Sequence, residues 1–276
     1  MMAKPERAPR RSPGGGGTAG ELVYAIGDIH GSYELLKELL AAVARDYAGR
    51  AKGRRPILIF LGDYIDRGPQ STSVLETMLW LQRREDIETH LLKGNHEQGL
   101  LAFVDSPEEG SGWLRFGGVE TLASYGVAPP DPVKGPQAYV RARDELLEAM
   151  PASHLRLLQR LELMAIIGDY AFVHAGIRPG TALKAQTERD LLWIREGFLD
   201  APQAFEKIIV HGHTWIGEDP QMLENRIGVD TGAYETGVLT ALRLDDGQRG
   251  ILQAGRGAQW RRAPPGVGGE LVITRA

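Results

Sequence analysis

Five short polar blocks, each placed directly after an apolar run, constrain this chain more than any other feature. Each run has the length and composition of a buried strand, and a polar residue at its end points out of the sheet edge. Five such edges can converge on one pair of divalent cations. The blocks are GDIHG at 27–31, GDYIDRG at 62–68, GNHE at 94–97, HAG at 174–176 and HGHT at 211–214. The runs before them are Leu22–Ile26, Ile57–Leu61, Ile87–Leu92, Tyr170–Val173 and Ile208–Val210.

Histidine and cysteine usage narrows the chemistry of these blocks. The chain has seven histidines and no cysteine. The lack of cysteine excludes disulfides, thiolate zinc sites and cysteine nucleophiles. Histidine is used mainly for chemistry, because five of the seven stand in the blocks: His30, His96, His174, His211 and His213.

Composition bounds the class of protein. With 276 residues, 42% hydrophobic and 25% charged, the chain fits a soluble globular protein of one large domain or two small ones. The net charge of −4 does not favour a nucleic-acid duplex as partner, and no apolar stretch is long enough to span a bilayer. Residues 1–20 are rich in Pro, Gly and Arg without an apolar core, which predicts a disordered tail rather than a secretory signal. We expect a cytoplasmic protein without a membrane partner, and its oligomeric state stays open.

After the tail, the chain divides into three regions. Strands and helices alternate first, at Leu22–Ile26, 35–43, Pro56–Leu61, Ser71–Arg83 and Ile87–Leu92. This alternation favours parallel strands with helical crossovers. Helical periodicity from about 104 to 160 predicts an insertion within a domain that spans 21–276. Further strands are expected at Leu163–Ile167, Tyr170–Val173, Ile227–Val229, Val238–Arg243, Ile251–Gln253 and Leu271–Thr274, with a loop at Gly255–Gly269. The pattern predicts an α/β fold with two sheets packed face to face and helices outside.

The residues in the blocks are those that hold hard or borderline metals. Asp28 and His30 are two apart at a strand exit, so both side chains can reach one cation. Asp63 offers two carboxylate oxygens, which suits a bridge between two cations. A carbonyl oxygen and imidazole nitrogens come from Asn95, His174 and His213. This set of oxygen and nitrogen donors fits manganese, iron or zinc better than copper(I), and magnesium less well.

The blocks resemble the signature of the calcineurin-like metallophosphoesterases. GDxHG, GDxxDRG and GNHE are similar to those of the phosphoprotein phosphatase branch, and the resemblance covers Glu21 to Leu244. The block at 212–214 is similar to that of the small bacterial and phage-type serine/threonine protein phosphatases. The resemblance implies a four-layer α/β fold. In that fold a central β-sandwich of mixed sheets is flanked by helices, and the dimetal site lies on loops at the strand ends.

The resemblance also implies a role for each site residue. The first metal would be held by Asp28, His30 and Asp63, and the second by Asp63, Asn95, His174 and His213. The implied catalytic residues are His96 as general acid, Asp66 as the carboxylate that orients it, and Arg67 and Arg195 as phosphate-binding arginines. For His211 two roles stay open, support of the site from behind and contact with the phosphate.

These residues together predict a hydrolase with two divalent metal ions, manganese first and iron or zinc as alternatives. Two cations about 3.5–4 Å apart would activate a bridging water for direct attack on phosphorus. His96 is next to the proposed ligand Asn95, so it lies near the metals but is free to give a proton to the leaving oxygen.

Three functions remain open. The leading prediction is hydrolysis of phosphoserine, phosphothreonine or phosphotyrosine in proteins, or of a small phosphorylated substrate. The alternative is hydrolysis of a dinucleoside polyphosphate such as diadenosine tetraphosphate, or of another nucleotide, because bacterial enzymes of that kind share the blocks. A non-catalytic binding module is disfavoured by the complete ligand set. A shallow groove would favour protein substrates, whereas a pocket closed by the insertion, with Trp113 or Trp215 to stack a base, would favour nucleotides.

Overall fold

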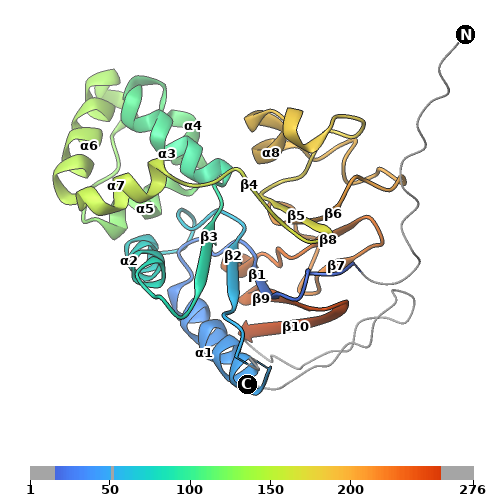
Figure 1. Ribbon diagram of the computed structural model, residues 1–276. Coiled ribbons are helices and arrows are strands. Elements are labelled where there is room, and N and C mark those ends of the chain that lie inside the picture. Colours follow the sequence, from blue (N-terminus) through green and yellow to red (C-terminus); the bar gives the residue numbers. More distant parts are fainter. Residues whose placement is uncertain (1–15, 51–52, 256–276) are drawn as a thin grey trace, which may run out of the picture.

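Two five-stranded sheets form the centre of the molecule (Figure 1). The computed structural model describes residues 16–50 and 53–255. The first sheet has the order β10-β9-β1-β2-β3 and the second the order β4-β5-β6-β8-β7. The strands are β1 (Leu22–Ile26), β2 (Ile57–Phe60), β3 (Glu88–Leu91), β4 (Met164–Ile167), β5 (Tyr170–Val173), β6 (Ile208–His211), β7 (Gln221–Met222), β8 (Arg226–Gly228), β9 (Val238–Asp245) and β10 (Gln248–Gly255).

Both sheets mix parallel and antiparallel pairs. In the first sheet β1, β2 and β3 pair in parallel, β9 pairs with β1 antiparallel, and β10 pairs with β9 antiparallel. In the second sheet β5, β6 and β8 are parallel, while β4 and β7 are antiparallel edge strands. Parallel neighbours end at the same edge of a sheet. Loops that follow the parallel strands of one sheet are therefore brought together.

The two sheets pack face to face, as predicted. Side chains alternate along a strand between the two faces of its sheet. On β1, Val23 and Ala25 belong to a buried cluster that also contains Phe172 and Val210 of the second sheet. Tyr24 and Ile26, between them, belong to the cluster under the helices. A strand buried on both faces reads as one continuous apolar run, which is why β1 could be predicted to the residue.

Helices cover the outer face of the first sheet and gather beside it (Figure 1). The two crossover helices are α1 (Tyr33–Arg50) and α2 (Ser71–Gln82). The insertion contains α3 (Asn95–Asp105), η1 (Pro107–Glu109), α4 (Ser111–Trp113), η2 (Leu114–Gly118), α5 (Val119–Ser124), η3 (Pro132–Lys134), α6 (Pro136–Ala149) and α7 (Ala152–Gln159). Three short elements accompany the second sheet and β9: η4 (Leu183–Ala185), α8 (Glu188–Trp193) and α9 (Ala233–Thr236). The helical part begins at Asn95, earlier than the predicted 104, because the GNHE block itself starts α3.

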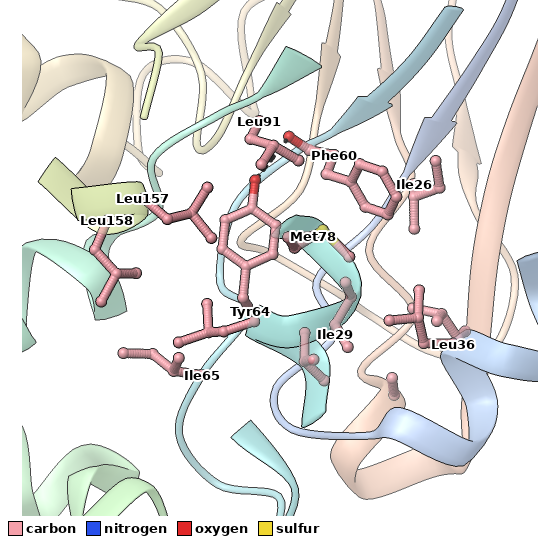
Figure 2. Packing of buried hydrophobic residues seen from close by; sticks show 14 of the residues in the cluster. Ile26, Ile29, Leu36, Phe60, Tyr64, Ile65, Met78, Leu91, Leu157 and Leu158 are labelled. Atoms are coloured by element: carbon pink, nitrogen blue, oxygen red, sulfur yellow. Dashed lines mark hydrogen bonds between the residues drawn. The ribbon is translucent and has the colours of Figure 1, made fainter. Parts of the chain in front are cut away.

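The loop after β2 is anchored in the core by its own apolar residues (Figure 2). Tyr64 and Ile65 are fully buried, and Figure 2 shows the Tyr64 ring directed toward Phe60 and Leu91. The Tyr64 hydroxyl donates to the Leu92 carbonyl at 2.8 Å. Burial of such a side chain contributes about 1.5–3 kcal/mol. The polar residues on either side of this apolar pair are therefore held on a rigid loop.

The structure corrects the predicted boundary of the tail. The prediction placed residues up to Gly20 in a disordered tail, but the described part of the chain begins at residue 16. The backbone N–H of Gly17 donates to Asp169 at 2.9 Å, and Thr18 is fully buried with its hydroxyl bonded to the Glu21 carbonyl. Residues 16–20 therefore pack against the turn between β4 and β5.

Outside the insertion, four short elements of the described ranges were not predicted from the sequence. η4 has three residues, α8 six, β7 two and α9 four, too few for a periodic pattern. Residues 1–15, the predicted strand Leu271–Thr274 and most of the predicted loop 255–269 lie outside the described residues. Within the described ranges, no helix combines the length and the apolar character needed to cross a membrane.

Candidate metal centre

Six parallel strands deliver polar side chains to one place, at their carboxyl ends. The residues that follow them are Asp28 after β1, Asp63 after β2, Asn95 after β3, His174 after β5, His213 after β6 and Asp230 after β8. All six are buried. Five of them were predicted as metal ligands. Asp230 was not predicted as a site residue. Like Asp28 it follows a predicted strand, and this placement could have indicated it.

Asp63 lies at the centre of this group. Its Oδ2 is 3.5 Å from Nε2 of His30, 3.5 Å from Nε2 of His174 and 3.9 Å from Nε2 of His96. Among the described residues, two clusters have ligand atoms that lie within 4.8 Å of one another, His30–Asp63–His96 and Asp63–His174–His213. Asp63 belongs to both, as expected for a carboxylate that bridges two cations.

The hydrogen bonds of two histidines show that the site fits a cation. Carbonyl oxygens only accept, so Nδ1 of His30 donates to Ile65 at 2.9 Å and Nδ1 of His174 donates to Leu61 at 2.8 Å. A neutral imidazole has one N–H, which leaves a lone pair on each Nε2. Both lone pairs face Oδ2 of Asp63, which is also an acceptor. A divalent metal ion bound by these residues would remove this repulsion, and metal-bound histidines are commonly held in this way through the other nitrogen.

Asp28 supplies a second indication that the site suits a cation. Its Oδ2 accepts a hydrogen bond from the backbone N–H of His213 at 2.9 Å, but its buried Oδ1 accepts none from the described residues. The Asp230 carboxylate lies within hydrogen-bonding reach of Asp28. Burial and the charge of Asp230 raise the pKa of Asp28 well above its usual value, and burial raises the pKa of Asp230 to about 7. Two adjacent buried carboxylates are costly without a counterion, so these residues fit a metal ion.

The histidines are in the protonation state that ligands require. Burial lowers the pKa of His30 to about 3 and that of His213 to about 2, and it also lowers the pKa of His174. Burial would raise the pKa of Asp63, but the charges of the neighbouring histidines, His174 first, hold it below its usual value. At neutral pH these three histidines are therefore neutral imidazoles and Asp63 is an ionised carboxylate, which is the form that binds metals.

The loops reach this geometry through unusual backbone. Positive φ angles for residues with side chains cost on the order of 1–3 kcal/mol each and persist only where the surroundings enforce them. Seven non-glycine residues of the described ranges have positive φ, and five lie in these loops: His30, Asp63, Asp66, Arg67 and His213. Close packing also explains two glycines of the blocks. A Cβ on Gly94 would overlap Oδ1 of Asp63, and a Cβ on Gly212 would overlap Oδ1 of Asp28.

The carboxylate of Glu97 anchors the backbone of the Asp63 loop. Its carboxylate accepts backbone N–H groups from Asp63 at 2.9 Å, Tyr64 at 2.8 Å and Gly94 at 2.9 Å. Burial and the charge of Asp63 raise the pKa of Glu97 to about 8. No role was predicted for Glu97 from the sequence. Its position three residues after Gly94, at the start of a helix, is typical of a capping box.

His96 and Asp66 form a hydrogen-bonded pair at the edge of the cluster. Nδ1 of His96 lies 2.7 Å from Oδ2 of Asp66. Burial lowers the pKa of His96, but the charge of Asp63 and the hydrogen bond to Asp66 outweigh it and leave the pKa above its usual value. The pair that the resemblance implied is therefore present, and Nε2 is the nitrogen that remains for a substrate.

Two arginines complete the wall of a cavity of about 510 Å³. Nη2 of Arg67 lies 3.3 Å from Nε2 of His96, and Nε of Arg195 donates to Nε2 of His213 at 3.1 Å. The Arg67 guanidinium lies over the ring of Tyr234, 4.5 Å from its centroid. Planar guanidinium groups suit the recognition of phosphate oxygens. Both arginines and all cluster residues except the fully buried His174 line the same cavity: His30, Asp63, Arg67, His96, Arg195 and His213.

The aromatic residues of the cavity differ from those predicted. Trp113 lies in the wall, but only 7% of it is exposed and its indole N–H is bonded to Asp66. Trp215 does not line the cavity and lies against Gly232 and Tyr234. The exposed aromatic rings of the lining are instead Phe116, 63% exposed, and Trp193, 46% exposed.

His211 lies behind the cavity. It is fully buried, its Nε2 is 3.2 Å from Nη1 of Arg226, and its Nδ1 donates to the Gly212 carbonyl at 3.0 Å. His211 is not part of the cavity lining. Of its two open roles, the position agrees with support of the neighbouring ligand loop and not with contact to phosphate.

Comparison with known proteins gives a consistent family. The family model described as "Calcineurin-like phosphoesterase" matches residues 22–232. The chain is 27% identical over 242 residues to "Bis(5'-nucleosyl)-tetraphosphatase PrpE [asymmetrical]" of Anoxybacillus flavithermus, covering 80% of this chain and 89% of that protein. It is 29% identical over 182 residues to "Shewanella-like protein phosphatase 2" of Arabidopsis thaliana, covering 57% of this chain and 46% of that protein.

A solved structure supports the same fold. The crystal structure of "a putative diadenosine tetraphosphatase" has a TM-score of 0.58 to this chain at 20% identity. The match covers 86% of this chain and 96% of the other. At this identity the likeness concerns the fold, and it confirms the mixed α/β architecture with two packed sheets.

Proposed function

We propose that this chain, which belongs to the calcineurin-like phosphoesterase family, hydrolyses phosphate monoesters, with phosphoserine and phosphothreonine of proteins as its first substrates. The family makes it a metal-dependent phosphoesterase. The substrate class is our inference. One observation carries it: the cavity lining contains two cationic side chains, Arg67 and Arg195, placed beside the Asp63 cluster.

A single terminal phosphoryl group matches this arrangement. It offers three oxygens, enough for two cations and two arginines. A tetraphosphate carries further phosphates, and each needs cationic contacts of its own. Among the described residues that line the cavity, the other ionisable groups are the carboxylates Asp63 and Asp230 and the site histidines. The charge balance of the cavity therefore favours a monoester.

Each residue has a definite role in this proposal. Metal ligands are Asp28, His30, Asp63, Asn95, His174 and His213, with manganese as the first choice of metal. Two cations held there would supply an activated water and neutralise phosphoryl charge. Arg67 and Arg195 bind the phosphoryl oxygens. His96 gives the proton on its Nε2 to the leaving oxygen, and Asp66 holds the proton on Nδ1.

Two observations favour the second candidate, a dinucleoside polyphosphate. Phe116 and Trp193 present exposed rings in the cavity lining, and such rings can stack on a base. The relative matched over 89% of its own length is named as a bis(5'-nucleosyl)-tetraphosphatase. Both candidates use the same metal and acid chemistry and differ in the group attached to the phosphate.

Steady-state kinetics on the manganese-loaded chain separate the two candidates. We expect kcat/KM for the best phosphoserine or phosphothreonine peptides to exceed that for diadenosine tetraphosphate. Asp63→Asn protein prepared in parallel serves as the blank for contaminating phosphatases. If kcat/KM for the tetraphosphate exceeded that for the peptides by orders of magnitude, the monoester assignment would be wrong, while the metal chemistry would stand.

A further inference from the structure

We propose that Trp113 and Thr121, both from the helical insertion, are positioning residues that fix the orientation of Asp66 and, through it, of His96. The inference rests on the proposed function, in which His96 is the general acid. It adds a role for the insertion, which would then control proton transfer as well as form one wall of the cavity.

Asp66 is held by donors on both of its carboxylate oxygens. Trp113 Nε1 donates to Oδ2 at 2.8 Å, the same oxygen that lies 2.7 Å from Nδ1 of His96. Thr121 Oγ1 donates to Oδ1 at 2.6 Å and accepts the backbone N–H of Asp66 at 2.9 Å. Asp66 is fully buried, so water does not compete for these contacts. With both oxygens bonded, the plane of the carboxylate is fixed.

The contacts also decide which nitrogen of His96 faces the cavity. An indole N–H is a donor only, so Oδ2 of Asp66 accepts from Trp113, and this contact favours the ionised form of the carboxylate. Nδ1 of His96 must then be the donor toward that oxygen. Nε2 is left beside Arg67 at 3.3 Å, on the cavity side. This is the nitrogen that reaches the leaving oxygen of a substrate.

Trp113 is itself held tightly. A Cβ on Gly99 would come within 2.9 Å of the indole, and one on Gly118 within 2.6 Å, so both glycines let the backbone approach the ring. On its far side the indole packs against Phe103, with ring centroids 4.9 Å apart. These contacts restrict the rotation of the indole, so its N–H stays directed toward Asp66.

The same segment holds the neighbour of Asp66. The Gly117 carbonyl accepts the backbone N–H of Arg67 at 3.2 Å. Asp66 and Arg67 both have positive φ, 72° and 66°, a conformation that needs support from the surroundings. Residues 113–121 thus contact two consecutive site residues from three points, the indole, a carbonyl and a hydroxyl.

The test compares variants that remove one donor each. Thr121→Val removes the hydroxyl at nearly constant volume, Thr121→Ser keeps it, and Trp113→Phe removes the indole N–H but keeps a ring. Thr72→Val is the matched control, because the Thr72 hydroxyl bonds Ser124 of the same helix α5 and does not touch Asp66. For each protein, kcat is measured on an alkyl phosphate and on p-nitrophenyl phosphate, together with metal content.

We expect Thr121→Val and Trp113→Phe to keep their metals and to lower kcat on the alkyl phosphate by about 10-fold, the cost of one hydrogen bond to a charged group. The loss on p-nitrophenyl phosphate should be clearly smaller, because nitrophenolate leaves without a proton. Thr121→Ser should restore the ratio of the two rates, and Thr72→Val should not change it.

Two results would overturn the inference. One is an equal loss on both substrates in Thr121→Val, and the other is the same change of ratio in Thr72→Val, since either would mean that these residues only support the fold. If Trp113→Phe does not fold, the comparison of Thr121→Val with Thr121→Ser still tests the inference. A manganese-loaded wild type that hydrolyses neither ester would instead overturn the proposed function, and the inference with it.

Discussion

Replacing Asp63 with asparagine should abolish most of the activity and empty the metal centre. The carboxylate lies within 3.9 Å of three histidine nitrogens and belongs to both ligand clusters. The amide keeps the Oδ1 that accepts the backbone N–H of His96, but it removes the charge that two cations would share. We expect the transition state to lose about 4 kcal/mol or more of stabilisation by the metals. This loss corresponds to a fall in kcat of at least about 10³-fold.

Elemental analysis after manganese loading and desalting measures the effect on binding. Asp46→Asn is the matched control, because Asp46 is also a buried carboxylate but pairs with Arg243 and Arg50 away from the cavity. We expect the control to lose stability and keep its metals. Full metal occupancy in Asp63→Asn would mean that Asp63 is not the bridging ligand.

Replacing His96 with asparagine should slow the reaction without removing metal. General acids contribute typically about 10²–10⁴-fold to a rate, so we expect a loss of that size in kcat on alkyl phosphates. The loss should be much smaller on p-nitrophenyl phosphate, whose leaving group needs no proton. The structural reason is the pairing of His96 with Asp66 at 2.7 Å, which keeps the pKa of the imidazole above its usual value despite its burial.

His154→Asn separates this effect from a general loss of structure. His154 is a buried histidine that bonds Tyr125 and Glu76 within the helical region and lies outside the cavity. The control should reduce thermal stability and leave the ratio of the two rates unchanged. An equal loss of kcat on alkyl and nitrophenyl phosphates in His96→Asn would show that His96 shapes the site and does not donate a proton.

The sequence predicted the scaffold well where the signal was local. β1 and β5 were predicted to the residue, because strands buried on both faces are continuous apolar runs. α1 and α2 followed from apolar residues at helical spacing. The closeness of Asp28 and Asp63 could be foreseen because neighbouring parallel strands of one sheet end at a common edge, and His174 joins Asp63 from the second sheet, which packs face to face with the first.

The remaining features depend on contacts between distant segments, which a local pattern does not contain. Trp113 was considered as a ring that would stack a base if the substrate were a nucleotide, but its indole N–H is bonded to Asp66, which is 47 positions earlier in the chain. Asp230 follows a predicted strand as Asp28 does, but it stands outside the five blocks, and its importance shows only in its closeness to Asp28. Phe116 lies in the segment that was predicted as helical, but the pattern does not show that it faces the cavity, and Trp193 comes from α8, which is too short for a periodic pattern.

Anomalous diffraction from crystals of the active, manganese-loaded chain tests the central claim, a dimetal centre around Asp63, most directly. We expect two manganese peaks about 3.5–4 Å apart. They should lie on either side of the Asp63 carboxylate, one beside His30 and the other beside His174 and His213. A single peak in the cavity, or peaks that Asp63 does not touch, would contradict it.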